Sequence, residues 1–167
     1  MISLEIITIV KNDIKGLIKT YDSLKKYCHN QNISWLIIDG SDYLEKYKFN
    51  GIRFRLVQQY ESGIYNAMNL GIQKSFGDYC IFLNAGDVFI NTFRLDEISK
   101  NYDVDVFCYS YVQSFSRFNR KKKAVIYKKK FMNLFAMPTS HQAMIFKGSK
   151  LREKFFDESF RICGDYA

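Results

Sequence analysis

Proline and histidine are scarce in this sequence of 167 residues, which contains one proline and two histidines. A single proline excludes a proline-rich linker. Two histidines, without any G-x-S-x-G sequence, argue against a Ser-His-Asp hydrolase. G-x-G-x-x-G and Walker sequences are also absent, which argues against dinucleotide-binding and P-loop proteins. The four cysteines are widely spaced and lack any C-x-x-C or Cys/His metal pattern, so we expect buried free thiols in a reducing compartment.

Long apolar runs are missing as well. No run approaches the roughly 18 residues that a membrane-spanning helix needs. The apolar N-terminal stretch, residues 2–10, contains Glu5 and lacks a basic flank, so it is interpreted as a strand and not as a signal peptide. These features predict a cytoplasmic protein, with peripheral contact to the inner face of the cell membrane left open.

Positive charge exceeds negative charge, with 25 Lys and Arg against 17 Asp and Glu and a net charge of +8. Such a balance favours polyanionic partners. Much of the excess lies in residues 117–130. Three interpretations of this segment stay open: a solvated loop or hairpin, a patch for anionic lipid headgroups, or a nucleic-acid site.

Short apolar runs alternate with stretches of helical periodicity. Helices are expected over residues 13–28, with Asp13 as the cap, and over residues 64–75. Strands are expected over residues 4–10, 34–39, 52–57, 79–83 and 104–109. This alternation predicts an α/β domain with a largely parallel sheet. Beyond residue 110 the sequence becomes aromatic and basic, and we interpret it as a mixed extension of the same sheet.

Polar residues follow three of the expected strands, where ligands bind in parallel sheets. They are Lys11–Asn12, Asp39–Ser41 and Asn84–Asp87. Asp39 could accept hydrogen bonds from a base or ribose, or it could simply close a turn. Asp87, beside Asn84 and Gly86, suits an oxygen-ligated divalent cation, although the same residues make a good turn.

Two further features stand near the C-terminal end. His141 and Gln142 precede the apolar run of residues 143–146, where they could line a pocket or serve as hydrogen-bonded structural side chains. Asp165 lies so close to the end that composition alone would assign it to a fraying terminus.

Several motifs occur in an order that is more specific than any one of them. The strongest is Glu61–Gly71, with the sequence ESGIYNAMNLG. The others are Thr8–Asn12, Ile38–Ser41, Gly77–Asp87, Ser140–Ala143 and the pair Asp165–Tyr166. Together they resemble the family 2 glycosyltransferases of the GT-A fold, and most closely the bacterial colanic-acid and O-antigen transferases. The resemblance spans essentially the whole chain.

This resemblance implies roles for individual residues. Asp87 would hold a divalent metal, Mn²⁺ or Mg²⁺, and Asp165 would be the catalytic base. Asp39 would contact the base of the nucleotide, and Glu61 would lie on its ribose side. His141 and Gln142 would lie near the sugar or the acceptor. The implied donor-binding residues are Thr8, Val10, Asn12, Asp39, Ser41, Glu61, Asn84, Gly86 and Asp87.

The implied activity is inverting, metal-dependent transfer of a sugar from a nucleotide-diphospho-sugar, typically a UDP-sugar. The acceptor would be a hydroxyl of a glycan or lipid-linked molecule in bacterial surface polysaccharide biosynthesis, such as that of lipopolysaccharide O-antigen. Residues 1–110 would form the nucleotide-binding half of one GT-A domain, and residues 111–167 the acceptor half.

Relatives continue beyond the position of Asp165, so the acceptor half is expected to be truncated and transfer to be poor. A catalytically weak nucleotide-sugar-binding module and a basic nucleic-acid-binding domain remain as alternatives. The oligomeric state stays open.

Overall fold

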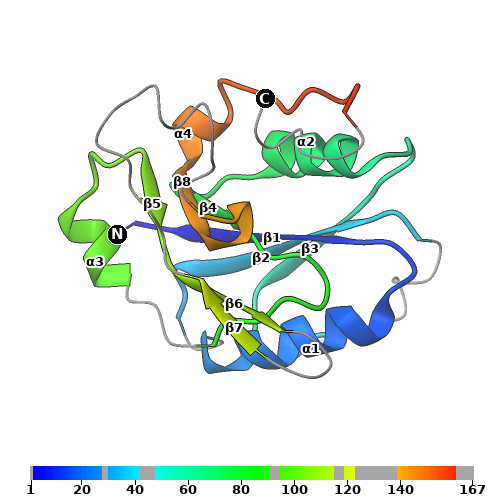
Figure 1. Cartoon of the computed structure of the whole chain (residues 1–167), viewed down its shortest axis with the longest axis horizontal. Coiled ribbons are helices and arrows are strands. Elements are labelled where there is room, and N and C mark those ends of the chain that lie inside the picture. The colour runs from blue at the N-terminus through cyan, green and yellow to red at the C-terminus, as the bar shows by residue number, and fades with distance from the viewer. Residues whose placement is uncertain are drawn as a thin grey trace.

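Strands and helices alternate along the chain in the computed structural model (Figure 1), as the apolar pattern predicts. The structure describes residues 2–27, 30–41, 48–90, 95–114, 119–122 and 139–160. The elements in the first half are β1 (Leu4–Val10), α1 (Ile14–Leu24), η1 (Lys25–Tyr27), β2 (Ile33–Asp39), β3 (Phe54–Gln58), α2 (Ile64–Lys74) and β4 (Tyr79–Phe82). Those in the second half are α3 (Leu95–Lys100), β5 (Val106–Cys108), β6 (Tyr111–Ser114), β7 (Asn119–Lys122), η4 (His141–Ala143), β8 (Met144–Lys147) and α4 (Gly148–Leu151).

Six of these strands form one sheet in the order β3-β2-β1-β4-β8-β5. The pairs β3–β2, β2–β1 and β1–β4 are parallel, whereas β8 runs antiparallel to both β4 and β5. Strands β6 and β7 form a separate antiparallel hairpin. The expected mixed α/β sheet with flanking helices is therefore confirmed, and β8 supplies the extension that was expected beyond residue 110.

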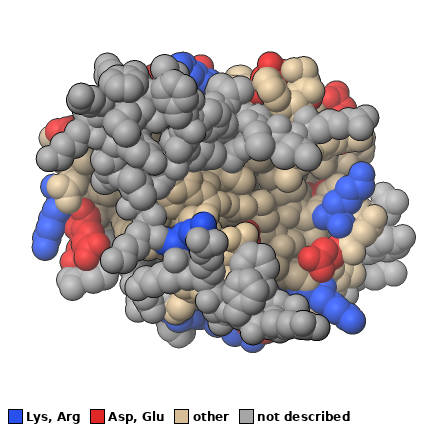
Figure 2. Space-filling view, in the orientation of Figure 1, with Lys and Arg blue, Asp and Glu red and all other residues tan. Residues whose placement is uncertain are grey.

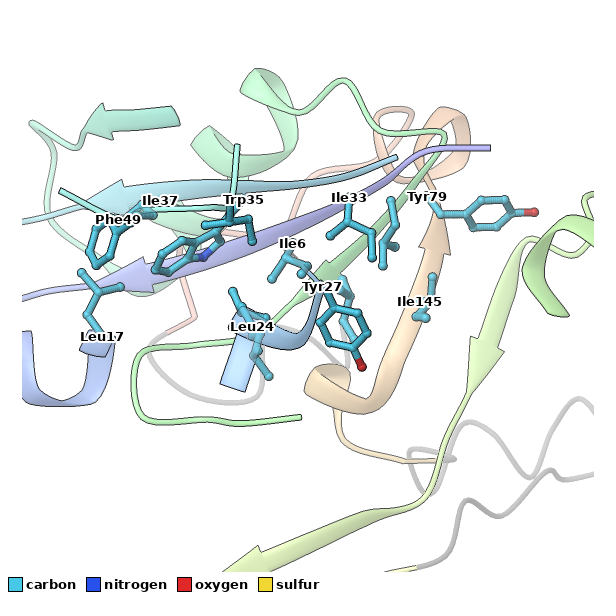
Figure 3. Packing of buried hydrophobic residues seen from close by; sticks show 14 of the residues in the cluster. Ile6, Leu17, Leu24, Tyr27, Ile33, Trp35, Ile37, Phe49, Tyr79 and Ile145 are labelled. Atoms are coloured by element: carbon cyan, nitrogen blue, oxygen red, sulfur yellow. The ribbon is translucent and has the colours of Figure 1, made fainter. Parts of the chain in front are cut away.

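The two faces of the sheet bury different sets of side chains, because successive residues of a strand point to opposite sides. On one face Ile6 and Trp35 pack with Leu17 of α1 (Figure 3). On the other face Ile7 packs with Met68 of α2. All five side chains are fully buried, and each such burial contributes roughly 1.5–3 kcal/mol. Helices α1 and α2 thus cover opposite faces (Figure 1).

The start of α1 confirms the predicted cap. The Oδ1 atom of Asp13 accepts a hydrogen bond from the backbone N–H of Gly16 at 2.8 Å, which satisfies a donor in the first turn of the helix. The short helices α3 and α4 were not expected. Among the described residues, no helix has the length and apolar character to cross a bilayer.

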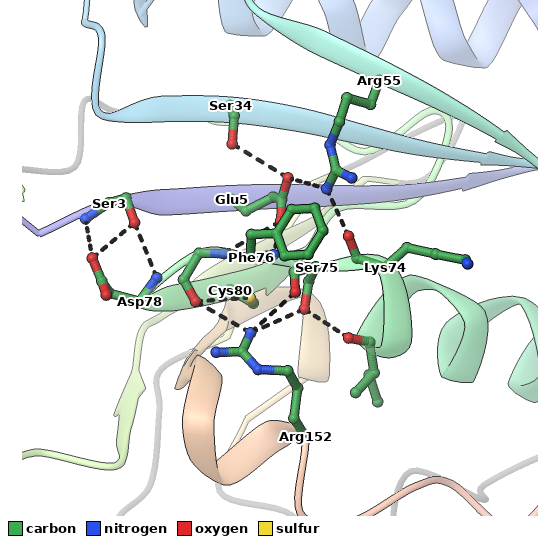
Figure 4. A network of polar contacts seen from close by, with 12 residues as sticks. Ser3, Glu5, Ser34, Arg55, Lys74, Ser75, Phe76, Asp78, Cys80 and Arg152 are labelled. Atoms are coloured by element: carbon green, nitrogen blue, oxygen red, sulfur yellow. Dashed lines mark hydrogen bonds and ion pairs between the residues drawn. The ribbon is translucent and has the colours of Figure 1, made fainter.

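A network of polar contacts lies near the N-terminal end of β1 (Figure 4). Glu5 is buried, and its carboxylate accepts hydrogen bonds from Arg55 at 2.9 Å and from the backbone N–H of Phe76 at 2.6 Å. The Arg55 guanidinium also donates to the carbonyl of Lys74 at 2.7 Å. The network joins β1, β3 and the end of α2, so we assign Glu5 to the scaffold.

Candidate active site

Three neighbouring strands bring the candidate residues to one edge of the sheet. Val10, the last residue of β1, pairs with Asp39, the last residue of β2. The backbone N–H of Gly40 donates to the carbonyl of Val10 at 2.8 Å. On the other side of β1, the N–H of Ala85 donates to the carbonyl of Ile9 at 3.1 Å. The turns that follow β2 and β4 therefore both adjoin the end of β1.

Asp39 closes the first of these turns. Its side chain is 1% exposed, and Oδ1 accepts hydrogen bonds from the backbone N–H of Ser41 at 2.8 Å and from the Ser41 hydroxyl. The Ser41 carbonyl in turn accepts from the Gln58 side chain at 3.1 Å. Within the described residues both hydrogen bonds of the carboxylate fall on Oδ1. Asp39 thus makes the turn that the sequence left open, at the edge where a ligand would bind.

Thr8 and Val10 lie in the core below this edge. The fully buried Thr8 hydroxyl donates to the carbonyl of Leu83 at 2.7 Å and accepts from the indole N–H of Trp35 at 2.8 Å. It therefore connects β1, β2 and the end of β4. Val10 is 2% exposed and belongs to the core cluster on the α1 face. Both residues support the edge from inside.

The second turn, Asn84–Asp87, packs against α1. The N–H of Asp87 donates to the carbonyl of Asn84 at 2.9 Å, and Gly86 has φ +95°, a conformation that favours glycine. The hydroxyl of Thr20 donates to the carbonyl of Asp87 at 2.8 Å and accepts from the N–H of Gly86 at 3.0 Å. Sequence analysis missed Thr20. The available signal was a polar residue one helical turn after Gly16 on the buried side of α1.

The side chains of Asn84 and Asp87 are held in a partly dehydrated environment. Burial raises the pKa of Asp87, while the charge of His141, a hydrogen bond from the Asn84 backbone and the charge of Lys19 act to lower it. The Oδ1 atom of Asn84 is buried and has no hydrogen-bond partner among the described residues. An unsatisfied buried polar atom costs roughly 1–3 kcal/mol. The turn therefore offers two oxygen ligands, a carboxylate and an amide oxygen, that a cation would satisfy.

These oxygens fit a divalent cation of the Mg²⁺ or Mn²⁺ type. Such ions prefer oxygen ligands and commonly bind through one or two carboxylates, with phosphate and water completing the shell. The described part of the chain contains no group of three or more His, Cys, Asp or Glu side chains that could hold a metal by itself. Phosphate oxygens of a bound ligand and water would complete the coordination shell of such an ion.

His141 is brought to this turn by the C-terminal part of the sheet. It lies in η4, directly before β8, and β8 pairs with β4, the strand that precedes the Asn84–Asp87 turn. The adjacent Gln142 accepts a hydrogen bond from the Ser140 hydroxyl through its amide oxygen. The structure therefore places His141 within electrostatic reach of Asp87, as its effect on the Asp87 pKa indicates.

Glu61 and Asn12 line separate cavities. Glu61 accepts a hydrogen bond from the Asn66 side chain at 2.8 Å, and Asn66 also donates to Glu158 at 3.2 Å. These three residues line a groove of ≈ 810 Å³ beside β3 and α2. Asn12, which has φ +55°, lines a second cavity of ≈ 470 Å³ at the start of α1. Among the described residues, Glu61 and Asn12 therefore line two different cavities.

Asp165 lies outside the described residues, as does most of the basic segment 117–130. Their predicted roles remain predictions.

The family model described as Glycosyl transferase family 2 matches residues 5–164. Among solved structures, S. aureus TarS 1–349 in complex with UDP is 16% identical with a TM-score of 0.75, and the match covers 98% of this chain and 53% of that one. The complex of TarS 1–349 with UDP-GlcNAc is 15% identical with a TM-score of 0.74, covering 98% of this chain and 51% of that one. The chain thus spans about half of those TarS structures, and at this identity the likeness shows a common fold. No curated protein sequence gives a significant match.

Proposed function

This chain belongs to glycosyl transferase family 2, and on that basis we propose that it transfers a sugar from a nucleotide-diphospho-sugar to an acceptor hydroxyl. The observation that supports the proposal most is that one turn carries both the Asp87 carboxylate and the Asn84 Oδ1 atom, which has no hydrogen-bond partner among the described residues. This turn lies at the edge of the sheet where the parallel strands end, which is where ligands bind in such sheets.

UDP is the proposed nucleotide. TarS, which has the same fold, is solved with UDP and with UDP-GlcNAc. In this chain Asp39 and Ser41 would face the nucleoside, with Thr8 and Val10 supporting them from the core. Asn12 and Glu61 would contact the donor from the two cavities that they line. The donor sugar itself is not assigned.

Asn84 and Asp87 would hold Mn²⁺ or Mg²⁺ together with the donor diphosphate. Gly86 has no side chain, so the diphosphate could approach the backbone of the turn closely. When bound, the cation would stabilise the negative charge that develops on the departing diphosphate. Lys19 places further positive charge within electrostatic reach of Asp87. His141 and Gln142 would border the sugar or the acceptor.

Asp165 is the proposed base. Its carboxylate would accept the proton of the acceptor hydroxyl while the hydroxyl oxygen attacks C1 of the sugar. The C1–oxygen bond to the diphosphate breaks in the same step, so the configuration at C1 is inverted. The proposed acceptor is a glycan or lipid-linked molecule of a bacterial surface polysaccharide, such as O-antigen. The basic segment 117–130 would contact the anionic inner face of the membrane.

Calorimetric titration with UDP, GDP and dTDP, with and without Mn²⁺, tests the donor site. We expect UDP binding to strengthen at least tenfold with Mn²⁺ in the wild type and to lose this gain in Asp87→Ala. Asp103→Ala removes an exposed carboxylate next to β5 and serves as the matched control. Equal Mn²⁺ dependence in both variants would contradict the assignment. Binding without transfer to any acceptor would favour a nucleotide-sugar-binding module.

A further inference from the structure

One hydroxyl on α1 contacts three of the four residues of the Asn84–Asp87 turn. Thr20 is fully buried, and its Oγ1 donates to the carbonyl of Asp87 at 2.8 Å, with a second, longer contact to the carbonyl of Asn84 at 3.3 Å. The same oxygen accepts a hydrogen bond from the N–H of Gly86 at 3.0 Å. All of these contacts are with the backbone, so they fix the path of the turn.

The contacts continue along α1. A Cβ atom added at Gly86 would lie 4.0 Å from the Cα of Gly16, one helical turn before Thr20, so the turn rests close against the helix. Ser23 accepts a hydrogen bond from the N–H of Phe89 at 3.3 Å, and Lys26 donates to the carbonyl of the same residue at 3.2 Å. Helix α1 and the following η1 therefore contact the chain after β4 as far as Phe89, and Thr20 makes the hydrogen bonds to the proposed ligand-binding turn.

This turn needs such support for two reasons. Gly86 has little intrinsic conformational preference, so the turn would sample other paths without an anchor. In addition, the turn offers two oxygen ligands, the Asn84 amide and the Asp87 carboxylate, and Mg²⁺ demands ligands close to ideal octahedral positions. A small change in the separation of these two oxygens would therefore weaken cation binding strongly.

We propose that Thr20 is a positioning residue for cation and diphosphate binding. Its hydroxyl holds the backbone of Gly86 and Asp87 so that the side-chain oxygens of Asn84 and Asp87 can act on one cation. Thr20 is fully buried, so it would act on the donor only through this turn. This inference rests on the proposed donor site, and it extends that site to a residue 67 positions away from Asp87 in the sequence.

Thr20→Val removes the hydroxyl with little change in shape, whereas Thr20→Ser keeps it. We expect Thr20→Val to weaken Mn²⁺-dependent UDP binding about tenfold, the size of effect typical for residues that orient metal ligands. UDP binding without Mn²⁺ should stay unchanged. Thr20→Ser should recover most of the loss. If Thr20→Val does not fold, Thr20→Ala tests the same missing hydroxyl.

The matched control is Ser75→Ala. Ser75 is also buried, and its hydroxyl donates to the carbonyl of Ile72 at 2.8 Å, but it follows α2 and has no contact with the turn. It should lower the melting temperature while leaving the Mn²⁺ dependence intact. Hydrogen exchange at the Gly86 and Asp87 amides adds a readout without nucleotide, and it should rise in Thr20→Val alone.

The outcomes separate the two proposals. Wild-type Mn²⁺ dependence in a folded Thr20→Val, or an equal loss in Thr20→Ser, would overturn the role of Thr20 and leave the donor site standing. No Mn²⁺-dependent UDP binding in the wild type would overturn both.

Discussion

At the scale of single residues, Asp87 occupies a position that costs stability when it is ionised. Burial raises its pKa above the ordinary value of 3.8. The unfolded chain has the ordinary pKa and the folded protein has the raised one. Between these two pKa values the folded protein binds more protons than the unfolded chain, so the free energy of unfolding falls as the pH rises through that window. We predict that Asp87→Asn melts at a higher temperature than the wild type at pH 7. Calorimetric melting between pH 3 and pH 8 measures the difference.

The pH dependence is the control for this prediction. Well below pH 3.8 the carboxyl group is protonated in both states, so the melting temperatures of the two proteins should converge as the pH falls. A lower melting temperature for Asp87→Asn at pH 7 would show that the carboxylate stabilises the fold. Mn²⁺ with UDP should raise the melting temperature of the wild type only, because the amide is a weaker cation ligand.

Local sequence predicts some of these residues and misses others. Asp13, Asp39 and Asp87 could be found because each follows a strand or precedes a helix in its own stretch of sequence. Thr20 could not, because its partners lie in the turn 84–87, more than sixty positions away. For the same reason the sequence did not indicate that Glu61 lines a groove beside α2 together with Glu158.

At the scale of elements, α2 anchors the segment that leads toward the C-terminus. The Asn69 side chain donates to the carbonyl of Phe156 at 2.9 Å and to Glu158 at 2.8 Å, and it accepts from the N–H of Phe156 at 2.8 Å. We predict that Asn69→Ala lowers stability by roughly 2 kcal/mol, because the part-buried backbone N–H and C=O of Phe156 lose their partners. Thermal melting, with hydrogen-exchange mass spectrometry of residues 153–160, measures both effects.

Gln73→Ala is the matched control, because Gln73 lies one helical turn further along α2 and is exposed. It should change neither the melting temperature nor the exchange of residues 153–160. Unchanged exchange in Asn69→Ala would show that the aromatic packing of Phe156 on Tyr65 and Phe82 holds the segment without the amide.

The elements themselves were predictable where the signal is local and long enough. β1, β2, β4 and both long helices follow directly from apolar runs and helical periodicity. The helices α3 and α4 have six and four residues, too few for periodicity to show. The insertion of β8 between β4 and β5 depends on pairing between distant segments, which the order of strands along the chain does not specify.

At the scale of the whole molecule, the net charge of +8 fits either a small anionic donor or a nucleic acid. Lys and Arg of the described residues lie at several separate places on the face shown in Figure 2, between acidic groups and uncharged surface. A protein that neutralises 6–10 phosphates loses about 10³–10⁵ in affinity between 50 and 200 mM salt. A single diphosphate bound at one turn releases far fewer counterions.

We therefore predict that Mn²⁺-dependent UDP binding weakens less than about tenfold between 50 and 200 mM NaCl, since few charges are neutralised at the site. Calorimetry at four salt concentrations gives the slope. A mixed-sequence DNA duplex, titrated under the same conditions, is the comparison, and it should bind more weakly than UDP at 200 mM NaCl. Duplex binding that is tighter than UDP binding and falls steeply with salt would favour the nucleic-acid alternative, because only an extended phosphate contact produces that slope.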